Sequence, residues 1–249
     1  MRSTSTPGVS SNRVVEPEQL DSLPPHDPRA RRSRRDLRRV HRAMRSLAIL
    51  LDAIERLSRV EPPRRILELG AGDASLTLRL VRALQRRWRG GDVVLLDRQR
   101  AIESETLEGF AALGWNAQTL CMDALEWARS ARRRNYDLCL TTLFLHHFRT
   151  PALTEVLAAV SMSAAAFIAC EPRRNAVARI GSRCIVLLGG NEVTREDAVT
   201  SVAAGFAGHE LTQLWPAEAP GWELDEYFAW PFTHCFVARR AVDRASASR

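Results

Sequence analysis

Short apolar runs alternate along the chain with longer stretches in which apolar residues recur every three or four positions. The runs are rich in aliphatic residues, as expected of parallel strands buried on both faces. These predicted strands cover residues 66–69, 93–97, 117–122, 136–142 and 166–172. Two last runs, 222–228 and 232–239, are joined by too few residues for a crossover and therefore predict an antiparallel hairpin. The alternation predicts an α/β fold.

A long amphipathic helix is predicted before the first strand. Apolar residues recur at spacings of three and four between Arg34 and Leu57, and the arginines gather in the N-terminal half. Much later, a mostly apolar insert at residues 173–193 precedes a helix whose start is predicted at Thr194, with Asp197 as the acidic third residue.

The chain ends are predicted to be disordered. Residues 1–30 are rich in Ser, Thr, Pro and charge and carry little apolar surface to bury, and residues 241–249 form a second short tail. Residues 31–240 then form one domain. No apolar segment near Met1 resembles a secretory signal, and no run reaches the roughly eighteen apolar residues of a membrane span. We therefore expect a soluble, cytoplasmic protein.

The net charge of +7 is local and arises without a single lysine. The first 45 residues contain eleven arginines against five acids, and the remainder is nearly balanced. An excess of arginine and alanine indicates a GC-rich genome as readily as a nucleic-acid partner.

The five cysteines do not form a recognisable site. They are widely spaced, lie mostly in apolar runs and include no C-x-x-C pair, which argues against disulfides and zinc. We expect reduced core residues and no bound metal.

The stretch from Glu68 to Ser75 carries the first chemical signal. It is a buried strand followed by a turn with Gly70 and Gly72 and then a helix, an arrangement that places free N–H groups beside a crevice. A dinucleotide turn would need a third glycine where Ser75 stands, and no Gly-Lys-Ser/Thr follows for a P-loop.

The sequence Glu68-Leu69-Gly70-Ala71-Gly72-Asp73 resembles motif I of class I S-adenosylmethionine-dependent methyltransferases. The resemblance covers roughly residues 34–240 and implies a Rossmann-like, doubly wound, seven-stranded sheet with an antiparallel last strand. It also implies that Glu68, Gly70, Ala71, Gly72 and Asp73 hold the methionine part of the cofactor. The chain departs from the family pattern in having Glu at position 68 and Ala74 in place of a third glycine.

Strand ends supply further candidates for cofactor binding. Asp97 ends the second strand about twenty-five residues after the turn, where a carboxylate can accept both hydroxyls of a ribose. The resemblance implies that Asp123 accepts from the adenine amino group, although a strand-end acid is also a common helix cap. It further places Arg98, Ala124 and Thr141 in the cofactor site.

The segment Leu145-His146-His147 after the fourth strand resembles the small-molecule branch of the family, and within it quinone- and polyketide-type enzymes of secondary metabolism. One of the two histidines, with His147 favoured, is the candidate general base. Two adjacent residues at a helix start are not expected to face the same way, so the other should pack or be solvated. The predicted substrate contacts are Phe144, Glu171, Arg173 and Arg174.

The sequence therefore predicts methylation of a small molecule, with O-methylation of a phenolic, quinone or polyketide-type acceptor favoured. The residue 31–60 helix is either a lid over the cofactor or a helix that only packs on the sheet. Two further alternatives stay open: an RNA-directed methyltransferase that uses the basic N-terminal region, and a non-catalytic cofactor-binding accessory protein.

Overall fold

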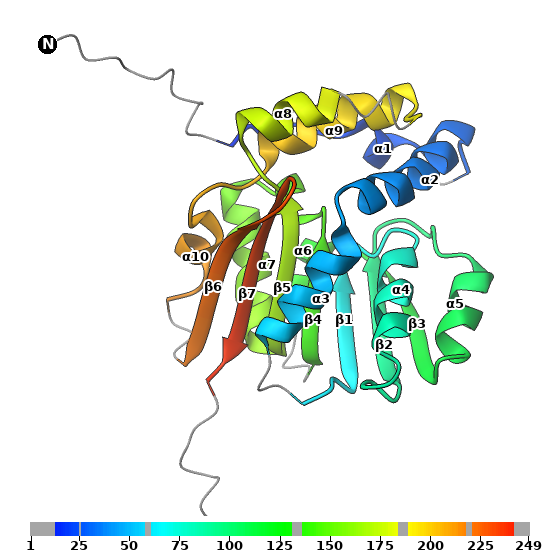
Figure 1. Cartoon of the computed structure of the whole chain (residues 1–249), viewed down its shortest axis with the longest axis vertical. Coiled ribbons are helices and arrows are strands. Elements are labelled where there is room, and N and C mark those ends of the chain that lie inside the picture. The colour runs from blue at the N-terminus through cyan, green and yellow to red at the C-terminus, as the bar shows by residue number, and fades with distance from the viewer. Residues whose placement is uncertain are drawn as a thin grey trace, which may run out of the picture.

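The computed structural model describes residues 13–24, 26–57, 61–130, 136–183, 189–217 and 221–241. At its centre is a seven-stranded sheet in the order β3-β2-β1-β4-β5-β7-β6 (Figure 1). The strands are β1 (Arg65–Leu69), β2 (Gly91–Asp97), β3 (Trp115–Cys121), β4 (Tyr136–Thr142), β5 (Ala164–Pro172), β6 (Trp222–Ala229) and β7 (Thr233–Arg240). Strands β1 to β5 pair in parallel, whereas β7 runs antiparallel to β5 and β6. The predicted fold class is confirmed.

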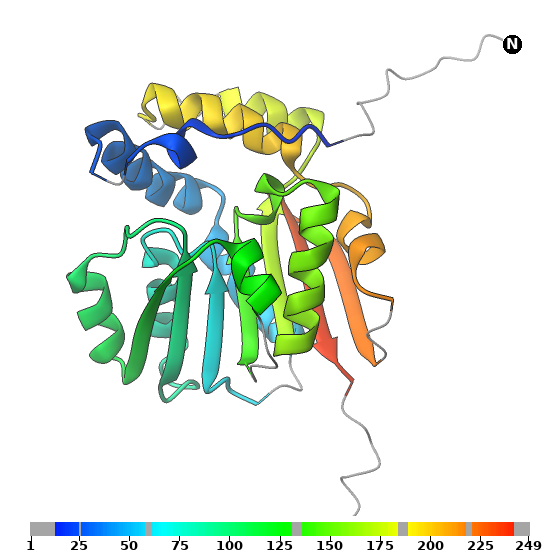
Figure 2. The same cartoon turned by 180° about the vertical axis from the view of Figure 1, so that it is seen from behind.

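Helices cover both faces of the sheet and the edge where the parallel strands end (Figures 1 and 2). One face carries α3 (Ser46–Arg56), α4 (Ser75–Ala83) and α5 (Ser104–Ala111). The other carries α6 (Ala124–Ser130), α7 (Thr150–Ser163) and α10 (Glu210–Leu214). Above the edge lie α1 (Gln19–Ser22), α2 (Pro28–Ala43), α8 (Ala176–Arg183) and α9 (Glu192–Ala204).

The sheet is buried on both faces because neighbouring residues of a strand point to opposite sides. Ile66 packs into the core under α3, α4 and α5, and the adjacent Leu67 packs into the core under α6 and α7; both are fully buried. This explains why the strands appear in the sequence as short continuous apolar runs.

The position of β1 determines where a ligand can bind. Strand β1 lies between β2 and β4, and the chain order reverses at this point. The connections after β1 and β4 therefore diverge and leave a crevice at the carboxyl edge, the usual ligand position in doubly wound sheets. The glycine turn after β1 and the histidine segment after β4 meet there.

The predicted helix from Arg34 to Leu57 is in fact two helices. Helix α2 ends at Ala43, and Arg45 adopts a left-handed conformation with φ of 58° before α3 begins at Ser46. Both helices bury one apolar face, so the apolar periodicity continues across the break. Helix α2 covers the carboxyl edge, whereas α3 packs on the sheet face. Pattern alone does not reveal this change of direction.

The prediction of a disordered tail over residues 1–30 does not hold for residues 13–24 and 26–30. This segment includes α1 and the start of α2, and it runs along α9 (Figure 2). The Asp197 carboxylate accepts the backbone N–H groups of Gln19 (2.7 Å) and Leu20 (3.0 Å). These hydrogen bonds hold α1, which has no buried residue, so the polar composition of the segment was misleading. Residues 1–12 lie outside the described residues.

The cap of α9 also differs from the prediction. Asn191, not Thr194, is the N-cap, and its side-chain oxygen accepts the N–H of Thr194 at 2.9 Å. Asp197 faces α1 instead of capping its own helix. Of the predicted insert at residues 173–193, the structure describes α8 and the start of α9, whereas residues 184–188 lie outside the described part.

The structure tests two expectations from the sequence, one about membrane-spanning helices and one about the cysteines. Within the described ranges, no helix is both long and apolar enough to cross a membrane. Cys139, Cys170 and Cys235 are buried free thiols, as predicted for core residues, whereas Cys121 is exposed and Cys184 lies outside the described residues.

Candidate active site

A cavity of about 330 Å³ lies at the crevice beside β1. The glycine turn, the ends of β2 and β3 and the segment after β4 form its floor, and residues of α1 and α2 form its roof. The predicted site residues on its wall are Glu68, Gly70, Ala71, Gly72, Asp73, Asp97, Arg98, Asp123, Ala124, Phe144, His146 and His147. Tertiary structure thus brings most of the predicted residues together.

The two glycines of the turn are required for different reasons. Gly70 has φ of 70°, and a Cβ there would lie 2.2 Å from the ring of Phe144. Gly72 has φ of 56°, but a Cβ there would meet no atom within 4 Å. At Gly72 it is the left-handed backbone, rather than lack of space, that favours glycine.

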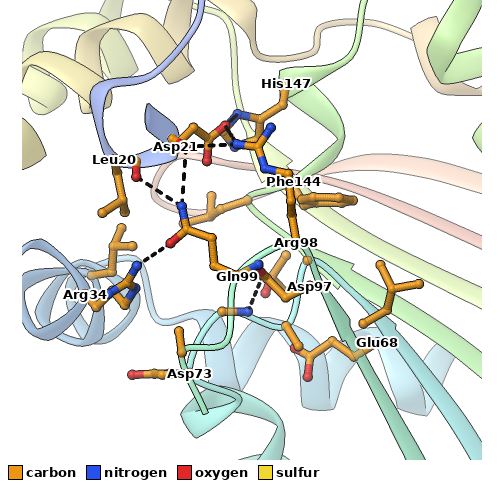
Figure 3. A pocket seen from close by; sticks show the side chains of 18 of the residues that line it. Leu20, Asp21, Arg34, Glu68, Asp73, Asp97, Arg98, Gln99, Phe144 and His147 are labelled. Carbon is orange, nitrogen blue, oxygen red and sulfur yellow. Dashed lines mark hydrogen bonds and ion pairs between the residues drawn. The ribbon is translucent and has the colours of Figure 1, made fainter. Parts of the chain in front are cut away.

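Asp97 ties the end of β2 to this turn. Its two carboxylate oxygens accept the N–H groups of Gly72 (2.8 Å) and Gln99 (2.7 Å), as Figure 3 shows. Burial raises the pKa of Asp97, against the opposite effect of these hydrogen bonds. Each oxygen keeps a second lone pair, so the predicted contact with ribose hydroxyls is compatible with this geometry.

Glu68 is an unusual residue of the cavity wall. Its side chain is buried, and Oε2 has no hydrogen-bond partner among the described residues. Burial raises the pKa of Glu68 to about 8, and the nearby charges of Asp73 and Asp97 act in the same direction. A buried carboxyl oxygen without a donor is costly, so this wall favours a ligand that brings a donor or a positive charge.

Asp73 and Asp123 both hold local backbone. Asp73 accepts the N–H of Ser75 at 3.0 Å and pairs with Arg38 of α2 at 2.7 Å. Asp123 accepts the N–H of Leu125 at 2.8 Å, near the start of α6. Both carboxylates nevertheless line the cavity, so the capping role and a ligand contact can coexist.

Thr141, Arg173 and Arg174 do not line this cavity. The Thr141 hydroxyl is buried and donates to a backbone carbonyl at the end of β1 (2.9 Å). The guanidinium of Arg173 lies 3.8 Å from the ring centre of Phe228, and Arg174 pairs with Glu210 at 2.5 Å. Their sequence position at strand ends is correct, but their side chains have partners elsewhere, which corrects the predicted contacts.

Glu171 is also removed from the predicted substrate contacts. Its carboxylate is fully buried and accepts the backbone N–H groups of Phe144 (3.1 Å) and Leu145 (2.9 Å). The same carboxylate lies 2.8 Å from Nδ1 of His146. Glu171 therefore positions the segment after β4 instead of facing a ligand.

The two histidines turn toward the same partner, contrary to expectation. Leu145–His147 forms a short 3₁₀ turn, the two imidazole centres lie 4.3 Å apart, and both rings face Glu18. Burial lowers the pKa of His146, but hydrogen bonds to Glu171 and Glu18 outweigh this effect and raise it to about 9. His146 therefore carries a proton near neutral pH and is unsuited to act as a base.

A second cavity of about 360 Å³ adjoins the first between α1, α2, α8 and α9. Most of its wall is apolar, with polar groups such as Ser33, Thr194 and Asp197 among them. Burial raises the pKa of Asp197 to about 6. The two cavities share Glu18, Leu20, Leu37, Leu143 and Ser201. A ligand in one cavity would therefore lie next to a ligand in the other.

Several wall residues were missed from the sequence. Glu18, Leu20 and Asp21 belong to the segment predicted to be disordered, and no local pattern distinguishes them. Gln99 accepts a hydrogen bond from Arg34 and donates to the Asp21 carbonyl at 3.3 Å (Figure 3). The one feature of the sequence that could have indicated Gln99 as a wall residue is its position two residues after Asp97.

No protein-family model and no curated protein sequence matches this chain. Solved structures do match. The plantazolicin methyltransferase BpumL in complex with SAH is 13% identical with a TM-score of 0.61, over 86% of this chain and 91% of that one. An O-methyltransferase family protein from Burkholderia thailandensis is 15% identical with a TM-score of 0.59, over 88% of this chain and 61% of that one. The pyocyanin biosynthetic protein PhzM is 20% identical with a TM-score of 0.56, over 90% of this chain and 62% of that one. These similarities show the class I methyltransferase fold.

Proposed function

We propose that this protein is an S-adenosylmethionine-dependent methyltransferase that acts on a small, largely apolar acceptor, by O-methylation of a phenolic, quinone or polyketide-type hydroxyl. The observation that carries the proposal is the pair of adjoining cavities. One is walled by the glycine turn and strand-end acids, and the other is mostly apolar. A methyl donor and its acceptor need such adjacent sites.

The first cavity has the chemistry that S-adenosylmethionine requires. The unpartnered carboxyl oxygen of Glu68 suits the amino group of the methionine part, and a cation there would favour the ionised carboxylate. Asp97 offers lone pairs for the ribose hydroxyls, and Asp123 for the adenine amino group. The cofactor, when bound, supplies a methyl group already activated by a positive sulfur.

The remaining work of the protein is to align the acceptor and assist loss of its proton. Leu37 and Leu143 give an apolar part to the wall common to both cavities, beside which an acceptor would be aligned. His147 stays the predicted base, since its side chain is partly exposed and lines the first cavity.

Three observations support a small molecule over RNA. The second cavity is apolar, and part of the arginine excess is already paired with acids, as for Arg38 with Asp73 and Arg39 with Asp36. The structural neighbours named above include enzymes of small-molecule biosynthesis, among them the pyocyanin protein.

Calorimetry with S-adenosylmethionine, S-adenosylhomocysteine and NAD tests the cofactor assignment. We expect binding of the first two and none of NAD. Release of S-adenosylhomocysteine with a panel of phenols and hydroxyquinones then tests catalysis and separates an enzyme from an accessory protein. Absence of cofactor binding, or turnover with RNA alone, would refute the proposal.

A further inference from the structure

Three side chains from two distant segments converge where the two cavities meet. The Nε2 atoms of His146 and His147 lie 3.2 and 3.9 Å from the two carboxylate oxygens of Glu18. One nitrogen or oxygen from each residue lies within 4.8 Å of those of the other two. Small rotations would bring all three atoms to the spacing of ligands around one ion.

The outer nitrogen of each imidazole also faces a carboxylate. Nδ1 of His146 lies 2.8 Å from Glu171, and Nδ1 of His147 lies 3.3 Å from Asp21 (Figure 3). A carboxylate at Nδ1 holds the ring orientation and leaves Nε2 facing a ligand position, where a metal ion would take the place of the Nε2 proton of His146. This arrangement is the usual support of metal-binding histidines. Here it occurs for both rings, with both Nε2 atoms directed to the same third residue.

The charges of the cluster leave room for a cation. Three carboxylates, those of Glu18, Asp21 and Glu171, surround two imidazoles, and they are partly offset by protonated His146 and by Arg13, whose charge acts on Glu171. Arg98 approaches Asp21 only to 3.9 Å, and its side chain is 56% exposed. A divalent ion between Glu18 and the two rings would offset this negative charge at short range.

We infer that Glu18, His146 and His147 form a binding site for a divalent transition-metal ion. Two imidazoles and one carboxylate suit zinc, manganese or iron(II), whereas magnesium and calcium prefer all-oxygen sites. The expectation of no bound metal rested on the cysteine pattern, whereas Glu18 lies 128 residues from His146 in the chain, a separation that local spacing does not reveal.

The role of the ion rests on the proposed function. Glu18 lines both cavities, so an ion at this residue would face an acceptor in the second cavity. A Lewis acid there lowers the pKa of the acceptor hydroxyl, which releases its proton to solvent and keeps the oxygen lone pair for methyl transfer. His147 would then be a ligand rather than the base.

The test uses full-length protein without a histidine tag, treated with EDTA and titrated with zinc or manganese by calorimetry. We expect one ion per chain. His147→Gln and Glu18→Gln should weaken binding at least tenfold, and Asp21→Asn should weaken it by about 10- to 100-fold. His26→Gln is the matched control, since His26 is exposed between α1 and α2, is not part of the cluster, and its variant should bind the ion as wild type does.

If all four variants bind the ion equally, the result is an adventitious ion only, and the inference fails. It also fails if the wild-type protein binds no ion. Thermal unfolding of each metal-free variant checks the fold, and His147→Gln carries the test if Glu18→Gln does not fold. S-adenosylhomocysteine affinity is measured on the same samples. Cofactor binding without metal binding overturns this inference and leaves the proposed function intact. Metal binding without cofactor binding overturns the proposed function and leaves the metal site intact.

Discussion

Glu68 places an acid in a site where its charge is unfavourable until a ligand arrives. The side chain is buried near the end of β1, and the nearby Thr77 hydroxyl is the one neighbour that acts to lower its pKa. The pKa is raised to about 8 from an ordinary value of 4.5, so the folded protein holds the proton more tightly than the unfolded chain. Stability from this group is complete below about pH 4.5 and decreases as pH rises to about 8.

Replacement of Glu68 by Gln should remove that pH dependence. The free energy of unfolding of Glu68→Gln relative to wild type should rise between pH 5 and pH 8.5 by on the order of 3 to 4 kcal/mol, or about 1.4 kcal/mol per pH unit. Urea unfolding of both proteins at the two pH values measures it, and other titrating groups cancel in the difference. Equal differences at both pH values would show that Glu68 is already ionised in the fold.

Asp97→Ala should weaken binding of S-adenosylhomocysteine by about 2 to 3 kcal/mol, because a charged acceptor for the ribose hydroxyls is lost. It should also lower stability, since the N–H groups of Gly72 and Gln99 lose their acceptor. Calorimetry and thermal unfolding report the two effects separately. Asp92→Ala, near the opposite end of β2, is the control and should leave affinity unchanged. Wild-type affinity in Asp97→Ala would remove this residue from the cofactor site.

At the scale of elements, α1 is the least predictable part of the site. It has four residues and no buried ones, yet its N-cap Glu18 and its third residue Asp21 line the first cavity. Its position depends on Asp197 of α9, which accepts two of its backbone N–H groups. The element is therefore held by a side chain about 180 residues later in the chain.

Removal of residues 1–24 should abolish turnover while leaving the sheet folded, because the shortened chain loses Glu18, Leu20 and Asp21 but no residue of the two apolar cores. Circular dichroism and S-adenosylhomocysteine release measure the two properties. A chain shortened by residues 1–12 is the matched control, since it keeps all of the contacts described above. Equal turnover of the two shortened chains would show that α1 does not belong to the site.

Helix α2 is placed to couple the two cavities. Arg38 and His41 line the first, Val40 and Ala43 line the second, and Leu37 lines both. The ion pair between Arg38 and Asp73 joins this helix to the glycine turn at 2.7 Å. The predicted lid role of residues 31–60 therefore concerns α2, while α3 packs against the sheet.

At the scale of the whole molecule, ligand binding should be visible as stability. S-adenosylhomocysteine at about 100 times its dissociation constant should add about 2.7 kcal/mol. For a chain of 249 residues, this corresponds to a rise in Tm of roughly 5 to 10 °C. Differential scanning calorimetry measures it, with NAD at the same concentration as the control. A rise with NAD instead would assign the first cavity to a dinucleotide.

The fold was predictable because its signals are local. Short apolar runs separated by helical periodicity mark the strands, and the spacing of Gly70 and Gly72 marks the turn. That Ile66 and Leu67 are buried on opposite sides of the sheet follows from the pleat alone. The acids at strand ends, Asp97 and Asp123, were predictable because parallel strands bring their carboxyl ends to one edge.

Tertiary structure alone decided which side chains face the cavities. Thr141, Glu171 and Arg174 occupy predicted strand-end positions, but a buried polar group takes the nearest partner that satisfies it, and those partners come from distant segments. By itself the sequence determined the sheet, the glycine turn and the edge at which a ligand binds, through local periodicity. Packing of α1 and α9 over that edge brings Glu18 to the two histidines. The sequence could not show this contact, because long-range hydrogen bonds leave no local pattern.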